Sequence, residues 1–290
     1  MTTKRKLIKI YTPQEERGFL GQGHTARPLL MGNFSETDPF IALMDDMLDK
    51  KDNGPAGGPH PHAGFETVSL LVDGKITEML ESMKKGDFQI MTAGSGIVHT
   101  ETINQPTRGR LFQLWLNLPK KNRWTTPRLQ ILPSEHTPVS EQNGINLRMY
   151  SGSLDGLSSP IQNYVPLILA EITMNPGAAT TLKIPANFNT FLVAISGTVE
   201  VGEDKKLLTK DQVGWLNHFD DDSQSDLILK AGEEGVRLVL YAAQPLGEEI
   251  VSHGPFIADH SDEIQKLYQE YRAGKMKHIS KSPVSQRITY

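Results

Sequence analysis

The chain has 290 residues, of which 38% are hydrophobic and 22% charged, and its formal net charge at pH 7 is -4. This composition is typical of a globular protein long enough for two domains, and the mild negative charge argues against nonspecific binding to nucleic acid or anionic membranes. The lack of cysteine excludes disulfides, thiolate zinc sites, iron–sulfur clusters and cysteine nucleophiles. No apolar run approaches the roughly 20 residues of a membrane span, and no signal-peptide core follows the basic cluster at residues 4–6, so we expect a cytoplasmic protein.

Short strand-like runs separated by turn signals dominate the chain, which favours an all-β fold of sandwich or barrel type. The turn signals lie at 72–75, 85–87, 175–177 and 196–197, and each contains a glycine. The predicted strands, in chain order, are Leu7–Tyr11, Phe40–Met44, Glu66–Val72, Ile76–Leu80, Phe88–Met91, Leu111–Leu118, Leu147–Tyr150, Val165–Ile172, Thr181–Ile184, Thr190–Ile195, Thr198–Val201, Asp211–Leu216 and Gly235–Ala242.

One helix is predicted near the C-terminus. Residues 261–263 supply an N-cap serine followed by two acidic residues, and Gly274 ends the pattern. Apolar residues recur at helical spacing between these limits, and we expect them to form a packing face. They are Ile264, Leu267, Tyr268 and Tyr271.

A weak internal repeat suggests that two halves of the chain are copies of one β-barrel. Residues 66–74 (ETVSLLVDG) and 190–197 (TFLVAISG) each read as a strand followed by a turn. The stretch 133–138 between the halves is polar and contains two prolines. We therefore predict two cupin-sized jelly-roll domains, residues 1–134 and residues 135–290, the second of which carries the terminal helix.

Two glycine-flanked motifs carry the candidate metal ligands. His60 and His62 stand two residues apart in GPHPHAGFET, and His99 and Glu101 do so in TAGSGIVHTE. Residues two apart on a strand project from one face, so two such strands facing each other offer three imidazole nitrogens and one carboxylate to a single ion. This donor set suits a divalent transition metal and leaves coordination positions open for chemistry.

These motifs also carry a resemblance to a known family. The spacing from Gly54 through His60 and His62 to Glu66 resembles the first cupin motif, and residues 86–104 resemble the second, with a threonine at position 92 in place of the usual proline. Within the cupins, HPHxGFETV and MTAGxGIxHxE are similar to the pirin family. Further matching stretches are DPF at 38–40, QLWLNLP at 113–119 and HGPF at 253–256.

The resemblance implies a two-domain bicupin with one metal in the N-terminal barrel. Carried over to this chain, its ligands are His60, His62, His99 and Glu101. The ion in pirins is usually Fe(II), and Zn, Mn, Ni, Co or Cu are the alternatives. The corresponding stretch of the C-terminal half, residues 187–191, offers no ligand cluster, so we expect that domain to be metal-free.

Two further residues are candidates for the site. Glu66 has the same strand parity as His60 and His62, and in many cupins a glutamate here is a ligand, whereas in pirins Glu101 takes that role. Glu66 is therefore an alternative base or a partner that orients a ligand from behind. Gln113 alternates with Trp115 on one face of a strand, which makes it a second candidate to lie behind the ligands, although an ordinary polar barrel residue fits equally.

The chain departs from the pirin pattern at three places. Ala63 stands where arginine is usual, which removes a basic group near the metal. The segment between Gly74 and Gly86 is short, which shortens a hairpin. Leu129 replaces a common aromatic residue. The other histidines lack a partner pattern and are expected to be structural or exposed; they are His24, His136, His218, His253, His260 and His278.

The favoured function is metal-dependent oxidation of a small aromatic substrate, because some pirins resemble quercetin dioxygenases. Glu101, or Glu66 if it is not a ligand, is the candidate base for a substrate hydroxyl. The alternative is a metal-sensing or redox-sensing regulatory protein that acts through protein partners without catalysis. A third reading is a different metal-dependent reaction, because fold does not fix function. We expect a monomer that contacts neither nucleic acid nor membrane.

Overall fold

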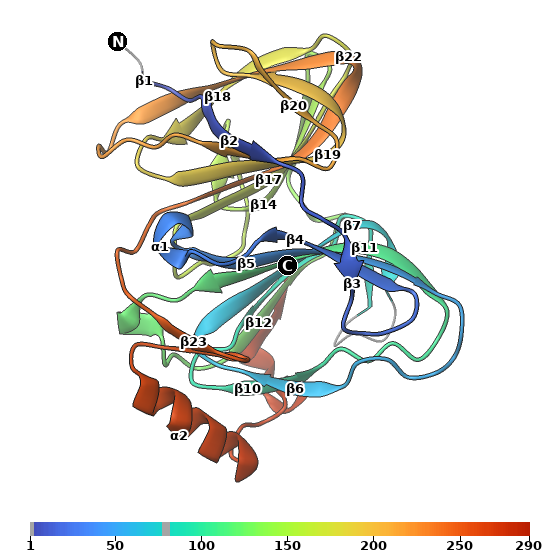
Figure 1. Cartoon of the computed structure of the whole chain (residues 1–290), viewed down its shortest axis with the longest axis vertical. Coiled ribbons are helices and arrows are strands. Elements are labelled where there is room, and N and C mark those ends of the chain that lie inside the picture. Colours follow the sequence, from blue (N-terminus) through green and yellow to red (C-terminus); the bar gives the residue numbers. More distant parts are fainter. Residues whose placement is uncertain (1–2, 77–81) are drawn as a thin grey trace. The chain divides into compact units, whose positions relative to one another are not determined.

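The structure, a computed structural model, describes residues 3–76 and 82–290 and consists mainly of β-strands, which confirms the predicted all-β class (Figure 1). The chain divides into two compact units. The first, called here the histidine unit, comprises Gln14–His136 and Leu246–Tyr290. The other, called here the second unit, comprises the chain up to Pro13 and Thr137–Pro245.

These units differ from the contiguous domains 1–134 and 135–290 at both ends of the chain. Strand β2 (Leu7–Tyr11) pairs with β21 (Val213–Leu216) of the second unit, whereas helix α2 (Ser261–Arg272) packs within the histidine unit. The predicted linker itself lies at the division between the units. The sequence does not predict these placements of β2 and α2, because an apolar pattern identifies a buried face but not the surface against which that face packs.

The main sheet of the histidine unit has the order β25-β12-β9-β7-β11-β5-β4-β3, with β8 paired to β7. Strands β6 and β10 form a separate antiparallel ribbon, and β23 pairs with β24. The bounds are β3 Glu16–Arg17, β4 His24–Leu30, α1 Phe34–Thr37, β5 Phe40–Lys50, β6 Pro59–His62, β7 Phe65–Ile76, β8 Met83–Lys84, β9 Phe88–Thr92, β10 Ile97–Thr100, β11 Thr107–Asn117, β12 Arg128–Leu132, β23 Val251–His253, β24 Phe256–Ala258 and β25 Arg287–Thr289, with 3-10 turns at Lys120–Asn122, Ile279–Lys281 and Val284–Gln286.

The sheet of the second unit has the order β13-β14-β17-β22-β19-β21-β2, with β1 and β18 on β22 and β20 on β19. One cluster of its core consists largely of aliphatic side chains and includes Leu192, Leu238 and Leu240, all fully buried. The remaining bounds are β1 Thr3–Lys4, β13 Val139–Gln142, β14 Ile145–Ser151, β15 Ser153–Leu154, β16 Leu157–Ser158, β17 Leu167–Met174, β18 Ala179–Pro185, β19 Asn189–Val201, β20 Lys206–Thr209 and β22 Gln224–Ala243.

Most predicted strands overlap observed ones, but two predicted turns are wrong. Residues 72–75 lie inside β7, and 196–197 lie inside β19, which joins two predicted strands into one. In each case a glycine at positive φ, Gly74 or Gly197, sits beside a shift in strand register. Such a β-bulge bends a strand without ending it. The predicted strand Ile76–Leu80 lies outside the described residues except for Ile76.

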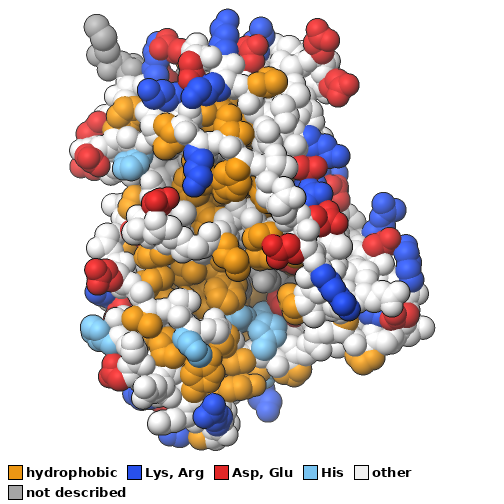
Figure 2. Space-filling view, in the orientation of Figure 1, with side chains coloured by type: hydrophobic (Ala, Val, Ile, Leu, Met, Phe, Trp, Pro, Cys, Tyr) orange, Lys and Arg blue, Asp and Glu red, His pale blue; other side chains and the backbone are white. Residues whose placement is uncertain are grey.

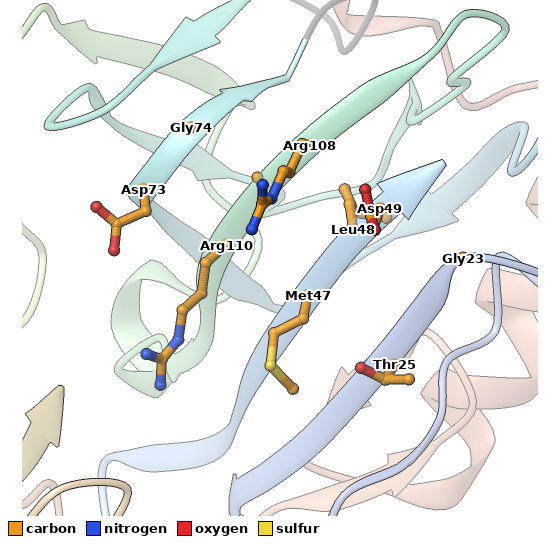
Figure 3. A pocket seen from close by; sticks show the side chains of 10 residues that line it. Gly23, Thr25, Met47, Leu48, Asp49, Asp73, Gly74, Arg108 and Arg110 are labelled. Atoms are coloured by element: carbon orange, nitrogen blue, oxygen red, sulfur yellow. The ribbon is translucent and has the colours of Figure 1, made fainter. Parts of the chain in front are cut away.

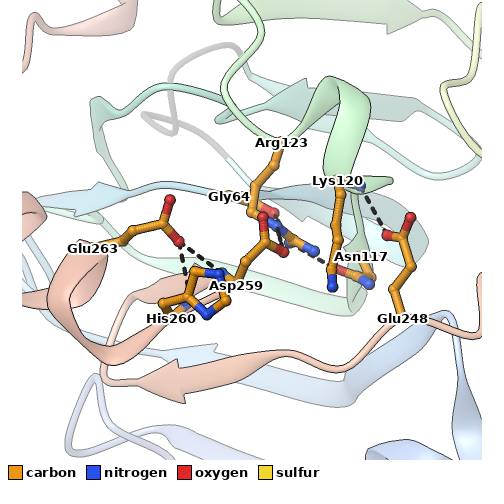
Figure 4. A network of polar contacts seen from close by, with 8 residues as sticks. All are labelled: Gly64, Asn117, Lys120, Arg123, Glu248, Asp259, His260 and Glu263. Carbon is orange, nitrogen blue, oxygen red and sulfur yellow. Dashed lines mark hydrogen bonds and ion pairs between the residues drawn. The ribbon is translucent and has the colours of Figure 1, made fainter.

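Helix α2 begins where predicted, but its first turn is closed from upstream. The carboxylate of Glu263 accepts hydrogen bonds from the backbone N–H groups of Asp259 and His260, both at 3.0 Å (Figure 4). Tyr271 is exposed, so the packing face is shorter than predicted. None of the helices in residues 3–76 and 82–290 has the length and apolar character needed to cross a membrane.

A buried arginine ties the end of the chain to the strands that carry the histidines. Arg123 is fully buried; its guanidinium donates to the Asp259 carboxylate at 2.8 Å, to the Asn117 side chain at 2.8 Å and to the Gly64 carbonyl at 3.0 Å (Figure 4). Gly64 joins β6 to β7, and Asp259 precedes α2. The ion pair therefore fixes the C-terminal segment beside the histidine ribbon.

We expect Arg123→Met to lower the free energy of unfolding of the histidine unit by about 3 kcal/mol, because removal of one partner leaves the partly buried Asp259 carboxylate and two buried acceptors unpaired. Arg123→Lys will restore little of this loss, since an ammonium group cannot reproduce the planar fork of donors. Urea denaturation measures both, with the exposed Arg17→Met as the matched control. A loss in Arg123→Met no greater than that of the control would refute the assigned role.

Candidate metal centre

Pairing of β6 with β10 brings the three predicted histidines together. The register sets His99 opposite His60 and Ile97 opposite His62. The candidate ligand atoms of His60, His62 and His99 all lie within 4.8 Å of one another, and the Nε2 atoms of His60 and His99 are 2.7 Å apart. The predicted parity argument therefore holds for these residues, and the group has the size of a site for one ion.

The surroundings of the rings suit metal binding. Nδ1 of His60 lies 2.9 Å from the Gly58 carbonyl, and donation of its N–H there leaves the Nε2 lone pair directed at the other rings. A backbone hydrogen bond at Pro255 acts on the buried His62 ring. Three imidazole nitrogens gathered this closely form a donor set that suits a divalent transition metal. The residues thus fit a metal ion.

The protonation of the rings favours the same conclusion. Burial, reinforced by the neighbouring histidines, lowers the pKa of His99 to about 3 and holds the pKa of His62 well below its ordinary value. Both rings are therefore neutral at pH 7, which is the form that binds a metal. The side chain of His60 is 33% exposed, and Figure 2 shows histidine side chains at the surface beside hydrophobic ones.

Glu101 and Gln113 border the histidine group. One carboxylate oxygen of Glu101 lies 3.7 Å from Nε2 of His60, and the other accepts a hydrogen bond from the Gln113 side chain at 2.9 Å. Burial raises the pKa of Glu101. The predicted roles, ligand or base for Glu101 and orienting partner for Gln113, therefore remain predictions with a suitable geometry.

Glu66 lies apart from this group. Glu66 is paired with Thr92 and Leu116 on the neighbouring strands. Thr67 and Ser69, which have the opposite parity on the same strand, line a small cavity with His99 and Glu101. Successive strand residues point to opposite faces, so Glu66 points away from the histidines. The alternation that would relate Glu66 to His62 fails because residues 63–64 separate strand β6 from strand β7. The roles of base, ligand or orienting residue are thus not supported for Glu66.

With this geometry established, sequence comparisons identify the family. The family model described as Pirin matches residues 13–116, and the one described as Pirin C-terminal cupin domain matches residues 169–277. Pirin of Homo sapiens is 32% identical over 285 residues, 94% of each chain. The chain belongs to the pirin family. A pirin-like protein of Solanum lycopersicum is 32% identical over 253 residues, 82% of this chain and 81% of the relative.

A solved structure adds a functional comparison for this pirin. Quercetin 2,3-dioxygenase from Acinetobacter baumannii is similar with a TM-score of 0.81 and 26% identity, covering 96% of this chain and 100% of that one. The likeness extends over both cupin domains.

The departures from the pirin pattern have structural counterparts. Ala63 is fully buried and belongs to an apolar cluster that includes Phe256 and Leu267 of α2. Its backbone also bridges to Phe256. A long basic side chain at this position would disrupt that contact. Leu129 is buried in a small apolar cluster. The short segment 74–86 includes residues 77–81, which lie outside the described residues.

Several residues beside the site were not predicted. The ring of Trp115 lies 5.4 Å from that of His62, a contact that strand alternation with Gln113 indicates in retrospect. His278, from the C-terminal segment, lies 2.9 Å from the Thr100 hydroxyl, next to His99. His24 is buried and bonded to Asp46 rather than being isolated. No sequence pattern links either histidine to the site, because both partnerships form only in the folded chain.

A separate hollow of about 700 Å³ lies over β4, β5, β7 and β11 (Figure 3). Its lining includes Arg108, Arg110 and Met47 but none of the predicted site residues. Arg110 makes a two-pronged ion pair with the fully buried Asp45, both bonds at 2.8 Å, so its charge is already balanced. We therefore place the candidate chemistry at the histidine ribbon and not at this larger hollow.

The geometry predicts opposite outcomes for two variants of candidate ligands. His99→Ala will reduce bound metal from about one ion per chain to near none, because two imidazoles hold a divalent ion poorly. Glu66→Gln will retain the wild-type metal content, since its side chain faces away. Elemental analysis after dialysis against metal-free buffer measures both. Metal loss in Glu66→Gln, or its retention in His99→Ala, would reassign the ligands.

Glu66 also has a predicted signature in the pH dependence of stability. Burial raises its pKa from 4.5 to about 7, so between these values the folded state holds a proton that the unfolded state has released. The stabilising contribution is therefore complete below pH 4.5 and is lost as pH rises through 7. The free energy of unfolding of Glu66→Gln, measured relative to that of wild type, will therefore rise by about 3 kcal/mol from pH 5 to pH 9.

Urea denaturation at the two pH values measures this difference. Both proteins keep the same histidines, so the pH dependence of metal binding cancels in the comparison. Equal differences in stability at pH 5 and pH 9 would show that Glu66 has an ordinary pKa.

Proposed function

We propose that this pirin is a mononuclear metal-dependent oxidoreductase that acts on flat, hydroxylated aromatic molecules, as a quercetin 2,3-dioxygenase does. The observation that carries the proposal is the convergence of His60, His62 and His99 beside the carboxylate of Glu101. The similarity to quercetin 2,3-dioxygenase from Acinetobacter baumannii over nearly the whole chain supports it.

The donor set of three imidazoles and one carboxylate leaves positions open for oxygen ligands, which suits Fe(II). Zn, Mn, Ni, Co and Cu remain alternatives, since imidazole binds each of them. When bound, such an ion supplies Lewis acidity toward a substrate hydroxyl, and a redox-active one also accepts and returns electrons.

The protein's own residues would position the substrate and move its proton. Glu101 is the candidate base, because a hydrogen bond from Gln113 fixes one of its carboxylate oxygens while the other faces His60. Apolar walls beside Glu101, formed by Leu48 and Leu111, exclude water from the aromatic body of the substrate.

A second candidate function is metal sensing through protein partners, without catalysis. One observation favours it: the cavity beside Glu101 has a volume of only about 30 Å³. That is room for about one water molecule. A site with little internal space suits a metal that changes charge and biases a nearby segment.

An oxygen-uptake assay separates the two functions. Iron-loaded protein mixed with quercetin in air should take up oxygen while the flavonol absorbance falls. His99→Ala should reduce the rates of oxygen uptake and of absorbance loss by at least about 100-fold, to the level of free iron. If wild type turns over no faster than His99→Ala while still retaining its metal, the enzymatic proposal fails and the sensing function is favoured.

A further inference from the structure

A loop of the histidine unit closes the apolar cavity that ends at Glu101. This loop, residues 18–23 between β3 and β4, is called here the 18–23 loop. The cavity is walled by Leu48, Ile103 and Leu111, ends at Glu101, and is covered from the loop by Leu20. Leu20 is partly buried and packs against the same apolar cluster. The loop therefore lines the same cavity as the candidate base.

The Leu20 side chain lies beside Gly57 and so close to the backbone of Glu101. A Cβ placed on Gly57 would lie 2.9 Å from Cδ2 of Leu20 and 2.0 Å from the carbonyl oxygen of Glu101. Only the lack of a side chain at Gly57, which also has a positive φ of 76°, permits this close stacking. Only Gly57 thus separates the Leu20 side chain from the backbone of Glu101.

A histidine–carboxylate pair holds the loop in this position. The N–H of Leu20 donates to Nδ1 of His24 at 3.1 Å, and Nε2 of His24 lies 2.8 Å from the carboxylate of Asp46 on β5. The His24 ring lies across Gly18, where a Cβ would come within 2.3 Å of it. Both ring nitrogens therefore have partners that hold the loop in place, and the pair also lines the cavity beside Leu20.

Phe19, next to Leu20, is 73% exposed and meets the edge of the His24 ring at 5.4 Å between centroids. A large aromatic side chain at the surface beside an apolar cavity offers a face on which a flat ring can stack. The closed cavity, about 30 Å³, is far too small for a single aromatic ring. A ring reaches Glu101 by this route only when the Leu20 side chain moves aside.

We propose that Leu20 is the specificity-determining residue for aromatic substrates of this site, and that the His24–Asp46 pair positions it. The inference rests on the proposed function, because it describes the substrate path of the same site. Leu20 sets how large a flat aromatic molecule can approach Glu101, and a smaller side chain admits a larger one.

The test compares two probes of different size, quercetin and the single-ring catechol, by calorimetric titration of zinc-loaded protein, in which no turnover disturbs the measurement. Leu20→Ala should bind quercetin about tenfold more tightly than wild type, Leu20→Phe about tenfold more weakly, and catechol affinity should change less than about twofold in either. Leu207→Ala, at an exposed leucine of the second unit, is the matched control and should behave as wild type.

Either Leu20 variant decides the matter if the other fails to fold. Quercetin affinities that agree within about twofold among wild type and the variants, or failure of quercetin to bind any of them, would overturn the inference. The same proteins loaded with iron distinguish it from the proposed function. If the quercetin affinities change as expected but no oxygen is taken up, the proposed catalysis is rejected and the role of Leu20 stands. If oxygen uptake is the same in wild type and in the Leu20 variants, catalysis stands and the role of Leu20 is rejected.

Discussion

The antiparallel pairing of β6 with β10 is the constraint on which the site depends. It places His60 directly opposite His99 and brings His62 beside them, so three imidazoles share one small space. Burial, reinforced by the neighbouring rings, lowers the pKa values of His62 and His99. An arrangement that is unfavourable for protons is favourable for a single divalent ion, because the ion satisfies all three nitrogens at once.

Segments far apart in the chain support this ribbon. The Val98 N–H donates to the Lys277 carbonyl, and Arg123 connects Gly64 to Asp259. Gly64 has a positive φ of 86°, and a Cβ there would lie 1.9 Å from the Ile257 carbonyl oxygen. The histidine unit is therefore completed by the last 45 residues of the chain, Leu246–Tyr290, and is not formed by the first half alone.

The sequence predicted the group of three histidines because its members lie in short local motifs. His60 and His62 share a strand, and His99 stands in a second glycine-flanked motif, so parity alone predicted their common direction. The same parity failed for Glu66 because it was extended across residues 63–64, where the strand is broken. Bulges at Gly74 and Gly197 were mistaken for turns, since a glycine at positive φ serves both purposes. The partners of His24 and the position of α2 depend on long-range packing, which local patterns do not encode.

The central claim is that three imidazoles and an adjacent oxygen donor surround one ion. X-ray absorption spectroscopy of the metal-loaded protein measures this most directly, because the fine structure counts the coordinated imidazole rings. The account predicts three imidazole nitrogens with oxygen atoms in the remaining positions of the shell. A shell with fewer than three imidazoles, or one made of oxygen alone, would contradict it.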